Sequence, residues 1–190
     1  ADFPRIAILS DKTIAVHWLQ KIGKSGFNYQ IKIALSADSG RTWSKPKILH
    51  EDRSLVQHGF ASMIPNKEKL LRIIWLDGRT YGIKSEETKN ITEAMQLRAT
   101  TITSDGLIGD EVAIDLRTCS CCQTSITVTD KGTVIAAYRD RSEGEIRDIS
   151  IARLERNIWQ EPFSLNYDGW ELSGCPVNGP AISSIDKLVA

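Results

Sequence analysis

The sequence lacks a net charge. Lys and Arg together number 24 among the 190 residues, and Asp and Glu together also number 24. A protein that binds nucleic acid usually carries an excess of basic residues, which displace the counterions of the phosphate backbone. The balance of charge therefore predicts that this chain has no nucleic-acid partner.

The sequence also lacks a long hydrophobic run. A helix that spans a bilayer needs roughly 20 consecutive apolar residues, and the longest apolar stretches here are Thr13–Leu19 and Leu70–Leu76. We therefore expect no membrane span. Hydrophobic residues make up 41% of the chain, which is ordinary for a globular protein and enough to form a packed core.

Helical periodicity is weak, and strand-like alternation with frequent turn signals takes its place. One pattern recurs along the chain: a strand, a polar turn, and a second strand that ends on an aromatic residue. That aromatic is Trp18, Trp75 or Tyr138 in three successive repeats. Each of these repeats continues with an alternating third strand and a short fourth strand. Repeated units of four strands predict the blades of a β-propeller.

The predicted fold is thus a single all-β domain, a β-propeller of four-stranded antiparallel blades. We expect blades at about residues 3–52, 57–116 and 121–168, and the start of a fourth at residues 176–190. The strands expected in them include Tyr29–Leu35, Leu70–Trp75, a short fourth strand of the third blade near Glu161–Leu165, and Gly179–Ile182 at the start of the fourth blade. The pattern breaks off inside a strand, so we expect further sequence after Ala190. The alternative is self-association, in which two copies of the chain close a ring and cover the open sheet edges.

Four cysteines stand at Cys119, Cys121, Cys122 and Cys175. An even number suits disulfides in an oxidising compartment, and four cysteines allow three pairings. A metal site in the cysteine cluster is the alternative, although the three histidines lie far from it in the sequence. We favour disulfides or buried thiols, and we expect neither a metal nor a cofactor.

Strand direction sorts the loops of such blades onto two faces. The loops between second and third strands, and the links between blades, fall on the same face. That face collects acids, cations, a histidine and aromatics, which together predict a ligand site. The residues expected to bind the substrate there are Arg5, His58, Asp77, Arg79, Arg139, Arg141, Arg147, Trp170 and Asn178.

These residue types suit a carbohydrate ligand. Arginine binds carboxylates bidentately, aromatic rings stack on sugars, and paired acids serve acid–base chemistry. Asp140 and Asp148 are the candidate catalytic acids. The structural alternative is that acids and arginines at strand ends form ion pairs that hold one blade to the next.

The segment Ser36-Ala-Asp-Ser-Gly-Arg-Thr-Trp43 matches the Asp-box pattern S-x-D-x-G-x-T-W. Asp38 is expected to cap the turn and Gly40 to allow a positive φ, so we assign this segment a structural role. With the repeats, it makes the chain resemble the sialidase (neuraminidase) superfamily of Asp-box, or BNR-repeat, propellers. Cys119–Gln123 and Gly174–Pro180 are similar to segments of bacterial secreted or periplasmic sialidase-like propellers.

This resemblance implies a six-bladed fold and an exo-glycosidase that hydrolyses terminal acidic sugars such as sialosides. In the family an arginine cluster binds the substrate carboxylate, an Asp donates the proton, and a Tyr–Glu pair is the nucleophile. Arg139, Arg141 and Arg147 match the carboxylate partners, and Asp140 and Asp148 match the acid. No Tyr–Glu pair is identified in this chain.

Two other functions stand beside the glycosidase. One is a non-catalytic propeller that binds a glycan or a protein partner with the same face. The other is a metal-dependent propeller that uses the cysteine cluster. The resemblance and the even number of cysteines together place the protein in a secreted or periplasmic location.

Overall fold

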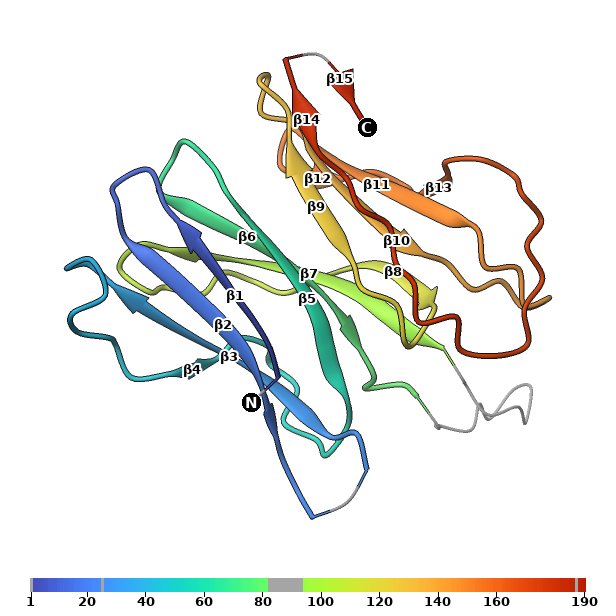
Figure 1. The fold of residues 1–190 in the computed structure, drawn as a ribbon, viewed down its shortest axis with the longest axis horizontal. Helices are drawn as coiled ribbons and strands as arrows, with labels where there is room; N and C mark the ends of the chain where they lie inside the picture. Colours follow the sequence, from blue (N-terminus) through green and yellow to red (C-terminus); the bar gives the residue numbers. More distant parts are fainter. Residues whose placement is uncertain (1, 25, 82–93, 187) are drawn as a thin grey trace.

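A computed structural model of the chain describes residues 2–24, 26–81, 94–186 and 188–190. The regular secondary structure of these residues consists of β-strands, which pair antiparallel (Figure 1). Among the same residues there is no helix of the length and apolar character that a membrane span requires. The prediction of an all-β chain with several antiparallel sheets is confirmed.

The first two sheets are four-stranded meanders in which each strand pairs with the next along the chain. The strands of the first sheet are β1 (Asp2–Ile8), β2 (Ile14–Lys21), β3 (Tyr29–Ser36) and β4 (Lys47–Ile48). The strands of the second sheet are β5 (His58–Pro65), β6 (Leu70–Asp77), β7 (Met95–Thr103) and β8 (Val112–Thr118).

The third sheet follows the same course, but two short strands pair with β11, and only the second of them falls in the region predicted as the fourth strand, near Glu161–Leu165. Its strands are β9 (Ser125–Val128), β10 (Val134–Arg139), β11 (Ile149–Glu155), β12 (Ile158–Trp159) and β13 (Phe163–Ser164). A two-stranded ribbon of β14 (Ser184–Ile185) and β15 (Leu188–Val189) ends the chain. Residues 166–183, here called the C-terminal strap, contain no strand, although the pattern predicted one from Gly179 to Ile182.

The burial pattern explains why these segments form strands. In β2, Ala15, His17 and Leu19 are buried, whereas the residues between them are partly exposed. Alternate side chains of a strand point to opposite faces, so β2 has one face in the core. The last five residues of β6 are all buried, because the second sheet packs against a neighbour on each face.

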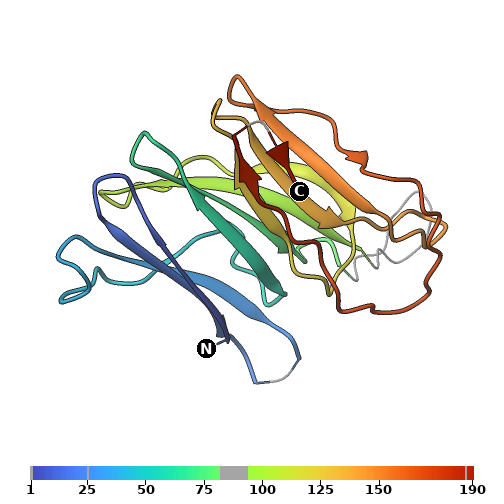
Figure 2. The same cartoon turned by 45° about the horizontal axis from the view of Figure 1, so that its top comes forward.

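The first strands of successive sheets lie side by side, as Figures 1 and 2 show. β5 lies beside both β1 and β9. The rings of Phe3 in β1 and Phe60 in β5 have centroids 5.9 Å apart. The Ser62 hydroxyl donates a hydrogen bond to the Thr124 carbonyl just before β9, at 2.6 Å. β14 continues the series, because the Ser184 hydroxyl donates to the Val128 carbonyl at 2.8 Å.

The turn between β3 and β4 is closed by its own side chains. The Asp38 carboxylate accepts hydrogen bonds from the hydroxyl of Thr42 at 2.6 Å and from its backbone N–H at 2.8 Å, which lower the pKa of Asp38 to about 2. Gly40 has a φ of 88°, a conformation that disfavours a Cβ. Trp43 remains 43% exposed, and its Nε1–H donates to the Gly40 carbonyl. The turn is therefore stabilised locally, as expected for a structural element.

The connections fall at two ends of the sheets. In Figure 1 the turns between first and second strands lie along the upper edge. The described residues of the loops that follow β2, β6 and β10 lie at the lower and right-hand edges, and we call this the loop end. The sequence places the candidate ligand site at the loop end.

Candidate functional site

A pocket of about 590 Å³ lies at the loop end. Its walls come from the loop before β3, the segments on either side of the β5–β6 pair, the link before β9 and the C-terminal strap. We call it the loop-end pocket. Residues that line it include Phe27, Asn28, Leu55, Gln57, Phe60, Tyr81, Cys121 and Cys175.

The described lining of the loop-end pocket is uncharged and partly aromatic. The side chain of Phe27 is 75% exposed and that of Tyr81 is 48% exposed, so both rings are available to a ligand. Asn28 and Gln57 add amide groups. Apolar rings combined with a few polar groups are typical of pockets that bind small organic molecules.

None of the sequence-predicted site residues lines this pocket, but two of them stand directly beside it. His58 follows the lining residue Gln57, and Asp77 precedes the lining residue Gly78. The Gly78 N–H donates to the Gln57 carbonyl at 2.8 Å, and a Cβ at Gly78 would lie 2.8 Å from the same oxygen. A glycine is therefore needed where β6 leaves the sheet beside the pocket.

His58 is buried in a polar cluster behind the pocket. Its Nδ1 lies 3.0 Å from the Tyr29 carbonyl, and its Nε2 lies 3.0 Å from Asp52 Oδ2 and 3.7 Å from Asp77 Oδ2. Both ring nitrogens thus face acceptors. The His50 ring stacks on His58 with centroids 3.7 Å apart. Burial, together with the His58 charge, lowers the pKa of His50 to about 3, so this ring is neutral.

Asp77 and Arg79 form a buried ion pair rather than an open binding site. The Asp77 carboxylate accepts two hydrogen bonds from the Arg79 guanidinium, both at 2.8 Å, and one from Trp75 Nε1–H at 2.9 Å. Burial alone would raise the pKa of Asp77, but the bonds from Arg79 and the His58 charge lower it. Arg79 also pairs with Glu111, which ties the end of β6 to the segment before β8.

A second group of predicted residues gathers where β10 and β11 approach the loop end. Arg139 stacks over the Trp170 ring, with its guanidinium carbon 4.7 Å from the ring centroid. Its Nε–H donates to the Asn178 carbonyl at 2.9 Å, and its Nη1 donates to the Arg147 carbonyl. Arg139 thus fastens the C-terminal strap to the third sheet.

Arg141 and Arg147 share one acid. Arg141 pairs with Glu145 Oε1 at 2.8 Å, and Arg147 pairs with Glu145 Oε2 at 2.6 Å. Arg147 is 2% exposed, and its Nη1 also donates to Cys119 Sγ at 3.1 Å. Two of the three arginines that were expected to bind a substrate carboxylate therefore already contact a protein carboxylate.

Asp148 and Asp140 differ in their surroundings. The Asp148 carboxylate accepts hydrogen bonds from the backbone N–H groups of Gly169 and Trp170, at 3.0 and 2.9 Å, so it holds the C-terminal strap. Asp140 instead lines a groove of about 660 Å³, together with Asp115 and other residues of β8, β11 and β13. Burial, reinforced by the Asp115 charge, raises the pKa of Asp140 to about 6. We call this groove, which Glu161 and Tyr167 also line, the acidic groove.

Arg5 lies apart from both groups. It is exposed on β1, opposite the buried His17 of β2. Neither ring nitrogen of His17 has a hydrogen-bond partner in the described structure. Burial, together with the Arg5 charge, lowers the pKa of His17 to about 4.

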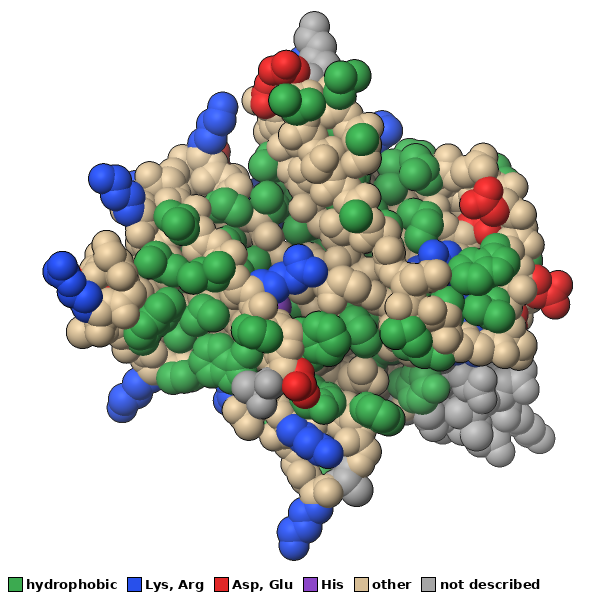
Figure 3. All heavy atoms as spheres, viewed as in Figure 1, with side chains coloured by type: hydrophobic (Ala, Val, Ile, Leu, Met, Phe, Trp, Pro, Cys, Tyr) green, Lys and Arg blue, Asp and Glu red, His purple; other side chains and the backbone are tan. Residues whose placement is uncertain are grey.

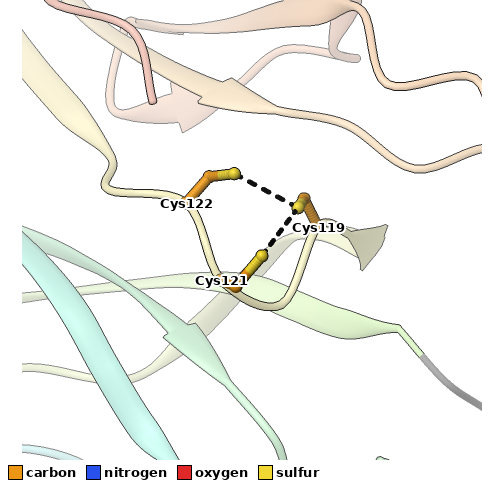
Figure 4. Close-up of side chains that lie close together, drawn as sticks. All are labelled: Cys119, Cys121 and Cys122. Carbon is orange, nitrogen blue, oxygen red and sulfur yellow. Dashed lines mark hydrogen bonds between the residues drawn. The ribbon is translucent and has the colours of Figure 1, made fainter. Parts of the chain in front are cut away.

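The cysteines form one cluster that joins the link before β9 to the C-terminal strap. Cys121 and Cys175 are joined by a disulfide, whereas Cys119 and Cys122 are buried thiols. Cys119 Sγ lies 3.3 Å from Cys122 Sγ and 3.8 Å from Cys121 Sγ, as Figure 4 shows. The expectation of disulfides or buried thiols is thus met by one disulfide and two thiols.

Two sets of residues have the composition and spacing of metal ligands. The ligand atoms of Asp52, His58 and Asp77 lie within 4.8 Å of one another, and so do the sulfurs of Cys119, Cys121 and Cys122. The first set already has protein hydrogen-bond partners, since Asp77 accepts hydrogen bonds from Trp75 and Arg79, and His58 pairs with Asp52. In the second set Cys121 is bound to Cys175.

The pocket-lining residues Phe27 and Leu55 were not predicted from the sequence, where most of the predicted site residues are charged. Phe27 stands in Gly23-Lys-Ser-Gly-Phe-Asn28, and Leu55 stands in another polar segment. A large apolar residue inside a polar loop has no core to enter, so it signals a surface that meets a ligand or a partner. The sequence alone therefore indicates that Phe27 and Leu55 lie at such a surface.

No known family model matches the sequence, and no curated protein is detectably similar to it. Among solved structures, a polysaccharide lyase of family PL25, an ulvan lyase bound to -[GlcA(1-4)Rha3S]-, is similar with a TM-score of 0.56 and 12% identity, over 89% of this chain and 44% of that chain. A second PL25 ulvan lyase structure is similar with a TM-score of 0.56 and 13% identity, again over 89% of this chain and 44% of that chain.

A protein of unknown function from Dyadobacter fermentans has 12% identity over 97% of this chain and 71% of that chain, but its TM-score of 0.34 carries no argument. This chain spans less than half of the ulvan lyases that it resembles. At such low identity the similarity shows the fold alone. The chain shares its all-β architecture with carbohydrate-active proteins.

Proposed function

We propose that this chain is part of a β-propeller that binds a carbohydrate in the loop-end pocket. The four-stranded sheets are the blades, at about residues 3–52, 57–116 and 121–168, and residues 176–190 begin a fourth. The side-by-side first strands support this assignment, because they line the axis of a propeller. The same geometry brings the loops of all three sheets to one pocket.

The observation that carries the binding proposal is the lining of the loop-end pocket. Exposed rings of Phe27 and Tyr81 offer apolar faces, and Asn28 and Gln57 offer amides. Sugar rings have apolar C–H faces and hydroxyl edges, so they match a surface of this kind. The solved ulvan lyase, which binds a uronate–rhamnose sulfate unit, is compatible with a glycan ligand.

The charges favour recognition of the neutral faces of a glycan over recognition of its carboxylates. Arg141 and Arg147 contact Glu145, and Arg79 contacts Asp77 and Glu111. The described pocket lining holds no charged side chain. A terminal sialoside, which the sialidase resemblance implies, would need a free arginine that this pocket does not supply.

Calorimetric titration with a panel of ulvan oligosaccharides, neutral oligosaccharides and α-sialosides tests the proposal. We expect Phe27→Ala to weaken binding roughly tenfold, since an aromatic contact contributes about 0.5–1.5 kcal/mol beyond its buried area. Tyr167→Ala, which removes a ring that is 86% exposed in the acidic groove, is the matched control and should bind normally. Weakened binding in Tyr167→Ala alone would place the ligand in the acidic groove instead.

The second candidate function is glycoside hydrolysis with Asp140 as the general acid. Its support is the pKa of Asp140, raised to about 6 by burial, since a carboxyl that is protonated up to about pH 6 can donate a proton in mildly acidic solution. Turnover of a fluorogenic glycoside should disappear in Asp140→Asn and decline in the wild type above about pH 6. Full turnover in Asp140→Asn would exclude this role. Asp148→Asn should mainly destabilise the C-terminal strap, because Asp148 binds its backbone.

A secreted or periplasmic location agrees with this function. The Cys121–Cys175 disulfide suits an oxidising compartment, where free glycans and polysaccharides are also met. Fractionation of the native host followed by immunodetection tests the location. Detection in the cytosolic fraction alone would contradict it.

A further inference from the structure

The cysteine cluster contains the parts of a thiol–disulfide exchange reaction. It holds one disulfide, Cys121–Cys175, and two thiols in a C-x-x-C arrangement, Cys119 and Cys122. Cys119 Sγ lies 3.8 Å from one sulfur of the disulfide. Reacting atoms in well-organised sites stand roughly 3–3.5 Å apart, so a small movement brings the thiol into contact with the disulfide.

Charges around Cys119 favour its reactive thiolate form. Hydrogen bonding from Cys122 and the nearby Arg147 guanidinium lower the pKa of Cys119 to about 6, although burial opposes the shift. Arg147 Nη1 donates to the sulfur at 3.1 Å. Arg139 lies near Cys122, and Glu145 balances Arg147 on its other side. The pKa of Cys122 is raised, so Cys122 keeps its proton and donates it toward Cys119.

We propose that the cluster is an internal thiol–disulfide exchange site in which Cys119 is the nucleophile and Cys122 is the resolving thiol. The Cys119 thiolate attacks Cys121 Sγ, the bond between Cys121 and Cys175 breaks, and Cys175 leaves as a thiolate. Cys122 passes its proton to Cys175 and attacks Cys119, which releases the Cys121 thiolate. One disulfide and one negative charge are present before and after, so no oxidant or reductant is consumed.

The exchange removes the covalent bond between the C-terminal strap and the link before β9. Cys175 stands in the strap and Cys121 in that link, and both line the loop-end pocket. The reaction thus replaces the Cys121–Cys175 bond, which spans the pocket wall, with a Cys119–Cys122 bond inside the link before β9. The proposal does not depend on what the pocket binds.

The sequence offers a direct readout of the exchange. Trypsin places Cys119, Cys121 and Cys122 in one peptide, residues 118–131, and Cys175 in another, residues 157–187. The Cys121–Cys175 disulfide links the two peptides, whereas a bond within the cluster leaves them separate. Protein incubated near neutral pH without reductant is quenched in acid, alkylated with a maleimide, digested and analysed by mass spectrometry.

We expect linked peptides together with a separate pair in which Cys175 is alkylated and residues 118–131 contain a disulfide. Cys119→Ser should leave only linked peptides, with Cys119→Ala as the alternative if the serine variant fails to fold. Cys122→Ser should still yield separate peptides, now with a Cys119–Cys121 bond. Ser120→Ala, in the same link, should behave as the wild type.

Three results would overturn the proposal. The first is a wild type that holds only the Cys121–Cys175 bond at every incubation time, with both remaining cysteines alkylated. The second is the oxidation of all four cysteines. The third is one zinc ion per chain bound by four thiols, found by mass spectrometry under native conditions and by elemental analysis, which would make the cluster a metal site.

Discussion

At the scale of single residues, the charged side chains that the sequence singles out divide according to their neighbours. Asp77 and Arg79 contact each other, and Asp148 binds backbone N–H groups, so these residues hold the fold together. Asp140 lines the acidic groove, and burial raises its pKa to about 6. Of the two candidate acids, Asp140 is therefore the one that we propose as a proton donor.

His17 yields a prediction about pH. Because burial lowers its pKa to about 4, the unfolded chain takes up a proton before the folded chain as the pH falls. The free energy of unfolding should therefore decrease as the pH is lowered from about 6.5 to about 4. His50, whose pKa is lowered to about 3, also destabilises the fold as the pH falls. At pH 5 we expect His17→Phe to unfold at a higher urea concentration than the wild type. Its free energy of unfolding should be higher by on the order of 1–3 kcal/mol, because the substitution removes unpartnered polar atoms.

Urea unfolding of the wild type and His17→Phe at several pH values between about 4 and 7.5 measures this effect, because that range includes the whole interval from about pH 6.5 to pH 4. The variant should lose less stability on acidification than the wild type. An equal loss in both proteins would show that His17 is hydrated or paired in solution.

Residue types at the loop end could be predicted from the sequence, but their pairing could not. Strand direction alone places Asp77, Arg79 and Arg147 at this end. The choice of Glu145 as the common partner of Arg141 and Arg147, or of Glu111 as the partner of Arg79, depends on distances across loops. Those distances are set by packing between sheets, which no local pattern contains.

At the scale of elements, the strand predictions succeed where alternation and turn residues agree. The predicted strand Tyr29–Leu35 is observed as β3 (Tyr29–Ser36), and the predicted strand Leu70–Trp75 as β6 (Leu70–Asp77). The fourth repeat fails at its start, since the strand predicted at residues 179–182 is absent and β14 begins at Ser184. Gly179 explains the difference, because its backbone lies against that of Gln123.

This close approach gives a prediction for the C-terminal strap. A Cβ at Gly179 would stand 1.8 Å from the Gln123 carbonyl oxygen, whereas a Cβ at Gly174 would meet no atom within 4 Å. Gly179→Ala should therefore displace the strap and destabilise the protein by roughly 1–3 kcal/mol, as overpacking does. Gly174→Ala, in the same strap, is the control.

Thermal unfolding and limited proteolysis compare the two glycine variants. We expect Gly179→Ala to unfold at lower temperature and to be cleaved faster within residues 166–183, and Gly174→Ala to match the wild type. Equal behaviour of the two variants would show that the strap does not pack against Gln123.

At the scale of the whole molecule, β1 leaves apolar side chains uncovered. Phe3, Ile6 and Ile8 are 57%, 67% and 62% exposed, and Figure 3 shows hydrophobic side chains over the region that β1 occupies in Figure 1. An apolar edge of this kind promotes association. In a propeller, the first strands of further blades would cover it.

The 190-residue chain should therefore self-associate in isolation. We expect its sedimentation coefficient to rise with concentration, and Ile6→Lys to reduce that rise. Ile158→Lys changes a side chain of equal exposure (66%) on β12, away from β1, and should have little effect. A monomer at all concentrations would contradict the interpretation of β1 as a surface that further blades cover.

Hydrogen–deuterium exchange with the oligosaccharide that binds best in titration shows whether a carbohydrate binds in the loop-end pocket. We expect slower exchange in peptides that contain Asn28, Gln57 and Tyr81, and unchanged exchange around Glu161 and Tyr167 in the acidic groove. Protection confined to the acidic groove, or no protection at any glycan concentration, would contradict it.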